Sequence, residues 1–197
     1  ATVTNSGNVL IINVGSSISA ASAVSISVSG IKNPDYAQTT TDYALETRNA
    51  SNAAIDQGTA GGNTITPGAI TATGVTLSNN TIQNSTMVTI SADFADSVPP
   101  GGFIKIGFPT GNTFSFGTVT ASSSTIGLSG VTCSVSANTV KILVSAGFSG
   151  AAFTDLQLSG ITNPTVIGDP GTWSITTINS AEAILDQVSG IAGTDTI

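Results

Sequence analysis

Apolar and polar residues alternate along this chain in short runs separated by turn-forming residues. A period of two places every second side chain on the same face of an extended segment, so each run predicts a β-strand with one buried face. Glycine and proline mark the turns, for example at residues 99–102, 109–112 and 169–171. No run shows a convincing amphipathic helix pattern. We therefore expect an all-β protein.

The predicted strands are clearest in residues 66–197. Short strands of this number fit a two-sheet β-sandwich, either immunoglobulin-like or of jelly-roll type. Both alternatives stay open, because the immunoglobulin cysteine pair is absent. The predicted strands lie near residues 69–77, 86–94, 102–108, 113–120, 125–134, 139–144, 155–161, 172–178 and 183–188.

A repeat underlies this pattern. Residues 8–57 recur without a gap as residues 138–187 at a constant offset of 130, and 15 of the 50 positions are identical. The shared signature reads SGIKNP at residues 29–34 and SGITNP at residues 159–164, and both copies later carry Asp-Gln. Self-similarity at a fixed offset predicts a repeated structural unit.

The two copies also end alike, since AGGNTI at residues 60–65 matches AGTDTI at residues 192–197. This places a module boundary near Ile65. We predict one complete β-sandwich module at residues 66–197, composed of a front half (66–130) and a back half (131–197). Residues 1–65 are then a second back half whose front half is missing, because Ala1 lies opposite Val131.

The composition supports the all-β prediction and narrows the function. Hydrophobic residues make up 40% of the chain and charged residues only 8%, and the abundant Val, Ile and Thr suit a pleated, half-buried surface. Eleven acidic and four basic residues give a net charge of −7. This charge argues against binding to nucleic acid, which requires a cationic surface.

The chain has the features of an extracellular protein. Its richness in Ser and Thr with few charges is typical of secreted surface layers and fibres. No apolar run approaches the length of a membrane helix and no signal peptide precedes Ala1, so we expect a mature, soluble chain that does not insert into membranes. The single cysteine, Cys133, cannot form an internal disulfide and is expected to be a small core residue.

Catalysis is not expected. The chain has no histidine, which excludes Ser/His/Asp and Cys/His nucleophilic sites. Asp93 and Asp96 flank a predicted strand end and could offer oxygen ligands to calcium, but no calcium-loop motif surrounds them. We interpret them as solvated turn carboxylates. The repeated Asp-Gln is likewise interpreted as architectural, and we expect no enzyme activity, no metal and no cofactor.

Glycans are a possible modification. Three Asn-x-Ser/Thr sequons stand at Asn49, Asn79 and Asn84, and an occupied sequon requires an exposed site in a secreted chain. Exposed Ser and Thr runs at residues 39–41 and 122–124 are candidates for O-linked sugars.

The incomplete module predicts an assembly surface. Its alternating strands leave apolar faces without cover, and three arrangements could cover them: strands from a neighbouring subunit, face-to-face packing on another module, or a polypeptide that continues beyond these termini. The candidate interface residues are Leu10, Ile12, Val14, Ile26, Val28 and Ile31.

The chain resembles the tandem immunoglobulin-like β-sandwich modules of secreted fibre, adhesin and pilus-type surface proteins. The residues that carry this resemblance are the SGI…NP strands and the strand IKIGFP at residues 104–109 after the PPGG turn. It covers residues 65–197 and the half module before them. The chain lacks a sorting motif and an N-terminal hydrophobic helix, so it departs from sortase-anchored chains and type IV pilins.

Two functional hypotheses follow. The first is a non-enzymatic extracellular subunit that assembles with copies of itself into a head-to-tail filament by strand complementation, with glycans on exposed loops. The second is an adhesin or carbohydrate-binding module that recognises surface glycans. Tyr36, Tyr43 and Trp173 are the aromatic residues suited to stack on sugars, although we expect Tyr43 and Trp173 to be core residues.

Overall fold

The computed structural model describes residues 1–71 and 74–197, and every regular element in that part of the chain is a β-strand. The all-β prediction is confirmed. The chain divides into two compact units, Ala1–Lys32 and Asn33–Ile197. This division lies upstream of the module boundary predicted near Ile65. Within the described residues, no helix is long and apolar enough to cross a membrane.

The first unit contains one β-hairpin, in which β1 (Thr2–Ser6) pairs antiparallel with β2 (Val9–Asn13). Gly7 turns the chain with a positive φ of 56°, a conformation that glycine adopts without steric cost. Residues 14–32 form no strand.

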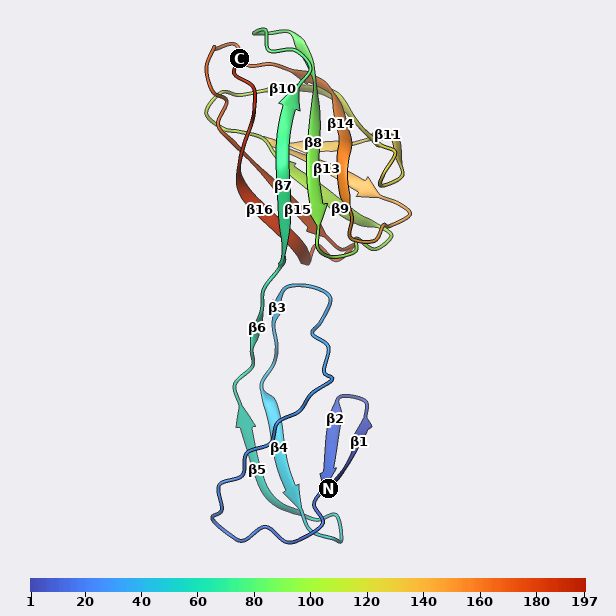
Figure 1. Cartoon of the computed structure of the whole chain (residues 1–197), viewed down its shortest axis with the longest axis vertical. Coiled ribbons are helices and arrows are strands. Elements are labelled where there is room, and N and C mark those ends of the chain that lie inside the picture. The colour runs from blue at the N-terminus through green and yellow to red at the C-terminus, as the bar shows by residue number, and fades with distance from the viewer. The chain divides into compact units, whose positions relative to one another are not determined.

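The second unit begins with two further strand pairs. The hairpin of β4 (Tyr43–Arg48) and β5 (Ala54–Ala60) exposes every residue of both strands. The short strands β3 (Gln38–Thr39) and β6 (Thr64–Ile65) pair with each other. In Figure 1 the hairpin appears as the two cyan arrows that precede the green β7 along the chain.

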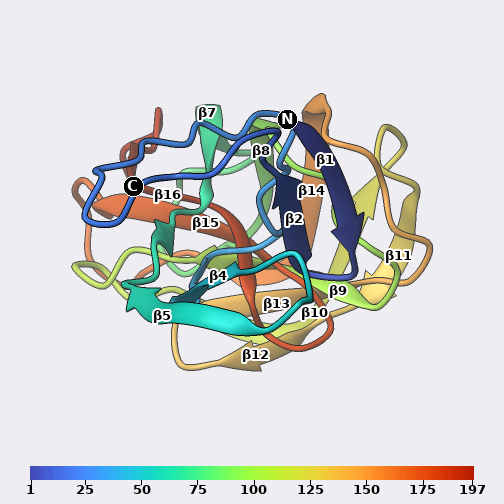
Figure 2. The same cartoon turned by 90° about the horizontal axis from the view of Figure 1, so that it is seen from below.

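Ten strands then form one mixed sheet that folds into two layers, which we call the sandwich (Figure 1). Figure 2 shows β7, β8 and β14 on one side, and β9, β12 and β13 on the other. The first layer has the order β11 (Leu128–Thr132), β10 (Ser115–Ser123), β14 (Ala152–Thr162), β8 (Ser85–Phe94), β7 (Gly68–Leu77). The second has the order β16 (Ile184–Ala192), β15 (Thr172–Ile178), β9 (Gly102–Gly107), β13 (Thr139–Val144), β12 (Ser134–Ser136).

Strand β7 connects the two layers. Its first residues pair parallel with β16, with Gly68 opposite Asp186. From Ile70 onward it pairs antiparallel with β8. Each layer also contains strands from residues 66–130 and strands from residues 131–197.

The core lies between the layers and follows the alternation seen in the sequence. Strand β8 buries every second residue from Thr86 to Phe94, and β9 buries Ile104 and Ile106 completely. Aromatic rings fill one region of the core, where Phe108 lies 4.4 Å from Trp173 between ring centroids. Large buried side chains dominate the stability of such a core.

The predicted strands agree with the observed ones within a few residues, except at residues 125–134. The single strand expected there is wrong, because β11 ends at Thr132 and β12 begins at Ser134. The two strands belong to different layers, since β11 pairs with β10 and β12 pairs with β13. Alternation continues through Cys133, so the sequence pattern does not reveal the change of layer.

Candidate assembly surface

The two hairpins of residues 1–65 share most of their strand register with their counterparts in the sandwich, although β15–β16 has a register shift between Trp173 and Ser174 that β4–β5 lacks. At the repeat offset of 130, the pair Thr4–Ile11 in β1–β2 corresponds to Ser134–Lys141 in β12–β13. The hairpin β4–β5 corresponds to β15–β16 in the same way, and its irregularity after Thr47 matches one after Thr176. The sequence repeat is therefore also a repeat of local structure.

The loops that connect the strands of β4–β5 and β15–β16 contain the same side-chain hydrogen bonds. The side-chain oxygen of Asn49 accepts hydrogen bonds from the backbone N–H groups of Ser51 (3.0 Å) and Ala53 (2.9 Å). Asn179 accepts the same bonds from Ala181 (2.9 Å) and Ala183 (3.0 Å). Asparagine side chains commonly close turns in this manner. The loop geometry thus accounts for an asparagine at both positions.

The copies differ in what covers their apolar residues. In β13 the side chains of Val140, Ile142 and Val144 are at most 1% exposed. Their counterparts in the first copy are the predicted interface residues Leu10, Ile12 and Val14. Leu10 is 42% and Val14 is 54% exposed, and Ile12 is half-buried.

The second set of predicted interface residues shows a larger difference. Ile26, Val28 and Ile31 are 60%, 45% and 74% exposed, and they lie in the segment without strand structure. Their counterparts are Leu156, Leu158 and Ile161, which are at most 1% exposed on β14. Both neighbours of β14, β8 and β10, belong to the front half. Residues 1–65 contain no counterpart of β8 or β10, so within the described residues this segment has no strand to pair with.

The glycine of the SGI signature shows the same missing partner. Gly160 has φ +79°, and a Cβ atom there would lie 2.1 Å from the backbone oxygen of Thr118 on β10. Only glycine fits such a close approach. Gly30 has the same φ of +79°, but a Cβ atom there would meet nothing within 4 Å.

The asparagine of the signature binds a front-half loop. Asn163 is 2% exposed, and its side-chain amide donates to the backbone oxygens of Asn79 (2.6 Å) and Thr81 (2.9 Å). It thereby anchors the loop that connects β7 to β8. The corresponding Asn33 is exposed.

The repeated aspartate is also tied to the front half. Asp186 is fully buried and accepts hydrogen bonds from the Asp96 backbone N–H and the Thr177 hydroxyl, both at 3.2 Å. Burial raises the pKa of Asp186, and the Asp96 carboxylate raises it further, against the opposing effect of these hydrogen bonds. Asp56 keeps only the local contact, a 3.1 Å hydrogen bond from the Thr47 hydroxyl. These hydrogen bonds support the architectural interpretation of Asp186.

Three residues of the repeated signature therefore reach into the front half in the sandwich. Gly160 packs on β10, Asn163 binds the β7–β8 loop, and Asp186 binds the backbone of Asp96. The first copy keeps all three residue types, at Gly30, Asn33 and Asp56. It is a back half with its front-half contacts unmade.

The outer face of the sandwich carries a small charge cluster. Lys105 on β9 and Lys141 on β13 both form ion pairs with Glu182, the first at 2.9 Å. Hydrogen bonds from the two lysines lower the pKa of Glu182. Exposed pairs of this type contribute little to stability, but they identify which charges lie together when β9 is in place.

The aromatic candidates for sugar stacking separate into two groups. Trp173 is 2% exposed, as expected for a core residue, so its ring is not accessible to a ligand. The expectation that Tyr43 is a core residue is wrong, because it is 47% exposed in a hairpin that no second layer covers. Tyr36 is 39% exposed.

The three sequons occupy different environments. Asn49 and Asn84 are exposed, and Asn79 is half-buried. The expectation of an exposed run at residues 122–124 is wrong at Ser123, which is 3% exposed. Its hydroxyl donates a 2.7 Å hydrogen bond to Asp155.

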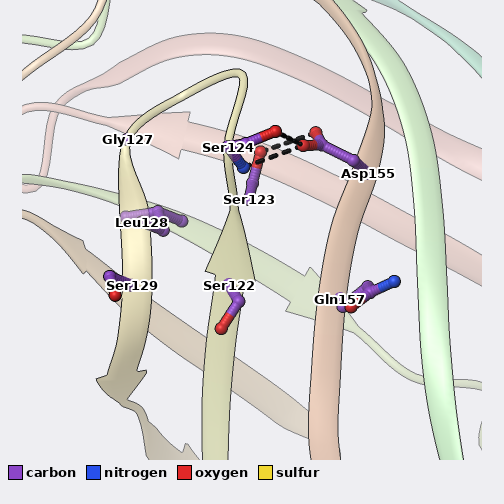
Figure 3. A pocket seen from close by; sticks show the side chains of 8 residues that line it. All are labelled: Ser122, Ser123, Ser124, Gly127, Leu128, Ser129, Asp155 and Gln157. Carbon is purple, nitrogen blue, oxygen red and sulfur yellow. Dashed lines mark hydrogen bonds between the residues drawn. The ribbon is translucent and has the colours of Figure 1, made fainter.

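An open hollow of about 620 Å³ surrounds this aspartate (Figure 3). The hydroxyls of Ser123 and Ser124 both point to the Asp155 carboxylate, and Gln157 lies along the same strand. Hydrogen bonds from these two serines hold the pKa of Asp155 well below its usual range. Since the carboxylate oxygens are already bound, Asp155 fixes the turn that follows β10.

The remaining residues to consider are the potential metal ligands and the cysteine. No group of three or more His, Cys, Asp or Glu side chains gathers within the described residues. Cys133 is half-buried and packs against the core, and desolvation raises the pKa of its thiol to about 11, which suppresses the reactive thiolate. In comparisons with known proteins, no family, no curated protein and no solved structure matches this chain.

Proposed function

We propose that this protein is a structural unit of an extracellular filament built from β-sandwich modules of immunoglobulin-like or jelly-roll type. Residues 1–65 act as the socket of each unit, and front-half strands of a neighbouring unit complete it. A head-to-tail contact of this kind does not close on itself and therefore generates a fibre. We also propose that exposed loops of the unit carry glycans.

One observation carries it. Gly30, Asn33 and Asp56 repeat residues that each contact a front-half strand or loop in the sandwich. In the first copy Asn33 is exposed and a Cβ atom at Gly30 would meet nothing within 4 Å, so these front-half contacts are not made within the described residues. The exposed apolar residues of the same segment supply the driving force, since burying them is favourable by about 25 cal/mol for each Å².

The count of halves bears on the source of the complement. Residues 1–197 contain two back halves and one front half, and β14, β13 and β15 of the sandwich already occupy the front-half strands. We propose that a neighbouring unit supplies the front half that covers residues 1–65, and that this front half is one not already occupied by a back half of its own. This arrangement connects successive units without requiring any part of the sandwich to open.

Electron micrographs of the native assembled material test the proposal. We expect filaments with one sandwich for each axial repeat, and strand density that passes from one unit into the next. Val28→Asp, at a position buried in the second copy, should dissociate the filaments, whereas the adjacent Ser27→Asp should leave them intact. Dispersed monomers at working concentration, with no strand crossing between chains, would contradict the proposal.

A further inference from the structure

A single strand connects the two back-half hairpins in the sandwich. Strand β9 lies between β13 and β15 and pairs antiparallel with both. Its Ile106 stands opposite Val140 on one side and Ile175 on the other. The hairpins β12–β13 and β15–β16 thus become one layer only through β9.

The corresponding hairpins of the first copy lie in different compact units. Strand β2, the counterpart of β13, belongs to Ala1–Lys32, and β4, the counterpart of β15, belongs to Asn33–Ile197. Within the described residues, β2 pairs with β1 and β4 pairs with β5. The edge that β13 and β15 each present to β9 is therefore open in both.

We propose that a strand of the β9 type, from a front half of a neighbouring unit that has no back half of its own, pairs antiparallel with the open edge of β2 and with that of β4. The inference rests on the proposed function only for the source of the strand. The repeat offset fixes the register. Ile106 of the incoming strand lies opposite Leu10 and Leu45, Ile104 opposite Ile12 and Thr47, and Lys105 opposite Ile11 and Glu46.

The apolar contacts in this register are complementary. Ile104 and Ile106 are 0% exposed in the sandwich. Ile106 would meet two exposed apolar side chains, Leu10 at 42% and Leu45 at 59%, whereas Ile104 would meet the half-buried Ile12 and the hydroxyl-bearing Thr47. Added strands of this kind gain affinity from backbone hydrogen bonds and specificity from alternate side chains.

The charges identify the occupant more closely. In the sandwich Lys105 forms an ion pair with Glu182, which the first copy replaces with Asn52. The first copy instead carries Glu46, at the position directly opposite Lys105 in the proposed register. The acidic partner has moved from the loop to the strand and remains next to the same lysine.

Lys141, the second lysine of the charge cluster, is also not conserved between the copies. Lys141 becomes Ile11 in the first copy, so the incoming lysine meets one carboxylate and no competing lysine on β2. In the isolated chain Glu46 forms an ion pair with Arg48 at 2.9 Å. A strand with a lysine at its centre is therefore the occupant that this surface favours.

A labelled peptide of residues 100–109 tests this inference with the intact chain. We expect saturable binding of one peptide per chain, with unchanged Trp173 fluorescence because the sandwich stays closed. Leu10→Ser should weaken binding by about ten-fold, whereas Ile11→Ser, at the outward-facing neighbour, should change it little. No binding, or equal losses in the two variants, would overturn the inference.

A charge exchange tests the register. A Lys105→Glu peptide should bind the wild-type chain about two- to five-fold more weakly, and the Glu46→Lys chain should restore its affinity. No restoration would overturn the register. Filaments without peptide binding would reject the β9-type strand and leave the proposed function standing. Peptide binding in the predicted register without native filaments would reject the function and leave this inference standing.

Discussion

The two copies of the back half share a sequence signature and differ in their surroundings. In the second copy, residues 131–197, the hairpin β12–β13, the strand β14 and the hairpin β15–β16 all pack into the sandwich. In the first copy, residues 1–65, the two hairpins form with most of the same register, but the segment equivalent to β14 forms no strand. Comparing the two copies therefore shows which elements form from local sequence alone and which require strands that are distant in sequence.

Connectivity explains the difference. Each hairpin pairs strands that lie next to each other in sequence, so its turn and side-chain hydrogen bonds specify it locally. Strand β14 pairs with β8 and β10, both of which belong to the front half. Extended backbone without a neighbour leaves its N–H and C=O groups unpaired. Residues 1–65 contain both hairpins but no counterpart of β8 or β10, and the segment equivalent to β14 forms no strand.

The largest contrast is expected for a matched pair of apolar residues. Ile175 is 1% exposed and its counterpart Leu45 is 59% exposed. Ile175→Ala should lower the free energy of unfolding by about 2–5 kcal/mol through loss of burial and formation of a cavity. Leu45→Ala should change it by less than about 0.5 kcal/mol. Urea denaturation followed by Trp173 fluorescence measures both, because the chain has one tryptophan. Equal effects would show that the hairpin of the first copy is packed in the isolated chain.

A second pair concerns the signature glycines. Gly160→Ala should destabilise the sandwich by about 2–4 kcal/mol, because the added methyl group meets the Thr118 carbonyl at a strained φ. Gly30→Ala strains the backbone at the same φ, but it should leave the unfolding transition of the sandwich unchanged, because Gly30 belongs to the separate unit Ala1–Lys32 and no atom lies within 4 Å of the added group. Thermal unfolding of the two variants provides the comparison. A lower midpoint for Gly30→Ala would mean that residues near Gly30 are covered in the free chain.

The signature asparagines should give a smaller effect. Asn163→Ala removes the two hydrogen bonds to Asn79 and Thr81 and should cost about 1–3 kcal/mol. Amide exchange at residues 79–84 should accelerate in this variant. The matched Asn33→Ala should leave exchange in the sandwich unchanged. Unchanged amide exchange at residues 79–84 in Asn163→Ala would show that Asn163 does not anchor the β7–β8 loop.

The smallest effect is the pH dependence of the sandwich. The folded-state pKa of Asp186 is raised, so the folded protein holds this proton more tightly than the unfolded chain does. The contribution is fully present below the unfolded pKa and is lost as pH rises through the folded pKa. Asp186→Asn should reduce the pH dependence of the free energy of unfolding between the unfolded and folded pKa of Asp186, and Asp56→Asn should leave that dependence unchanged. Asp155, whose pKa is lowered, should act with the opposite sign, and stability should fall as pH drops below the usual carboxyl range.

The sequence predicts this fold well where neighbouring segments pair. Alternation locates the strands, and the offset of 130 correctly relates β1–β2 to β12–β13 and β4–β5 to β15–β16. Alternation does not reveal that the chain changes layer at Cys133, or that β7 pairs with both layers, because these features depend on strands distant in sequence.

The candidate surface was predictable in part. The apolar period identifies Leu10 and Val28 as residues of an inward face, and the structure leaves both exposed. The functions of Gly160, Asn163 and Asp186 were not predictable, because their partners at Thr118, Asn79 and Asp96 lie elsewhere in the sequence. The exchange of Glu182 for Glu46 could be recognised only after β9 had been placed between β13 and β15.

The most direct test is a high-resolution reconstruction of residues 1–65 in the native assembled material. We predict an additional strand paired with the edge of β2 and with that of β4, with a lysine beside Glu46, and residues 22–32 extended between two further strands from a neighbouring unit. A reconstruction in which both hairpins face solvent, or pack only against the hairpins of another copy, would contradict the account.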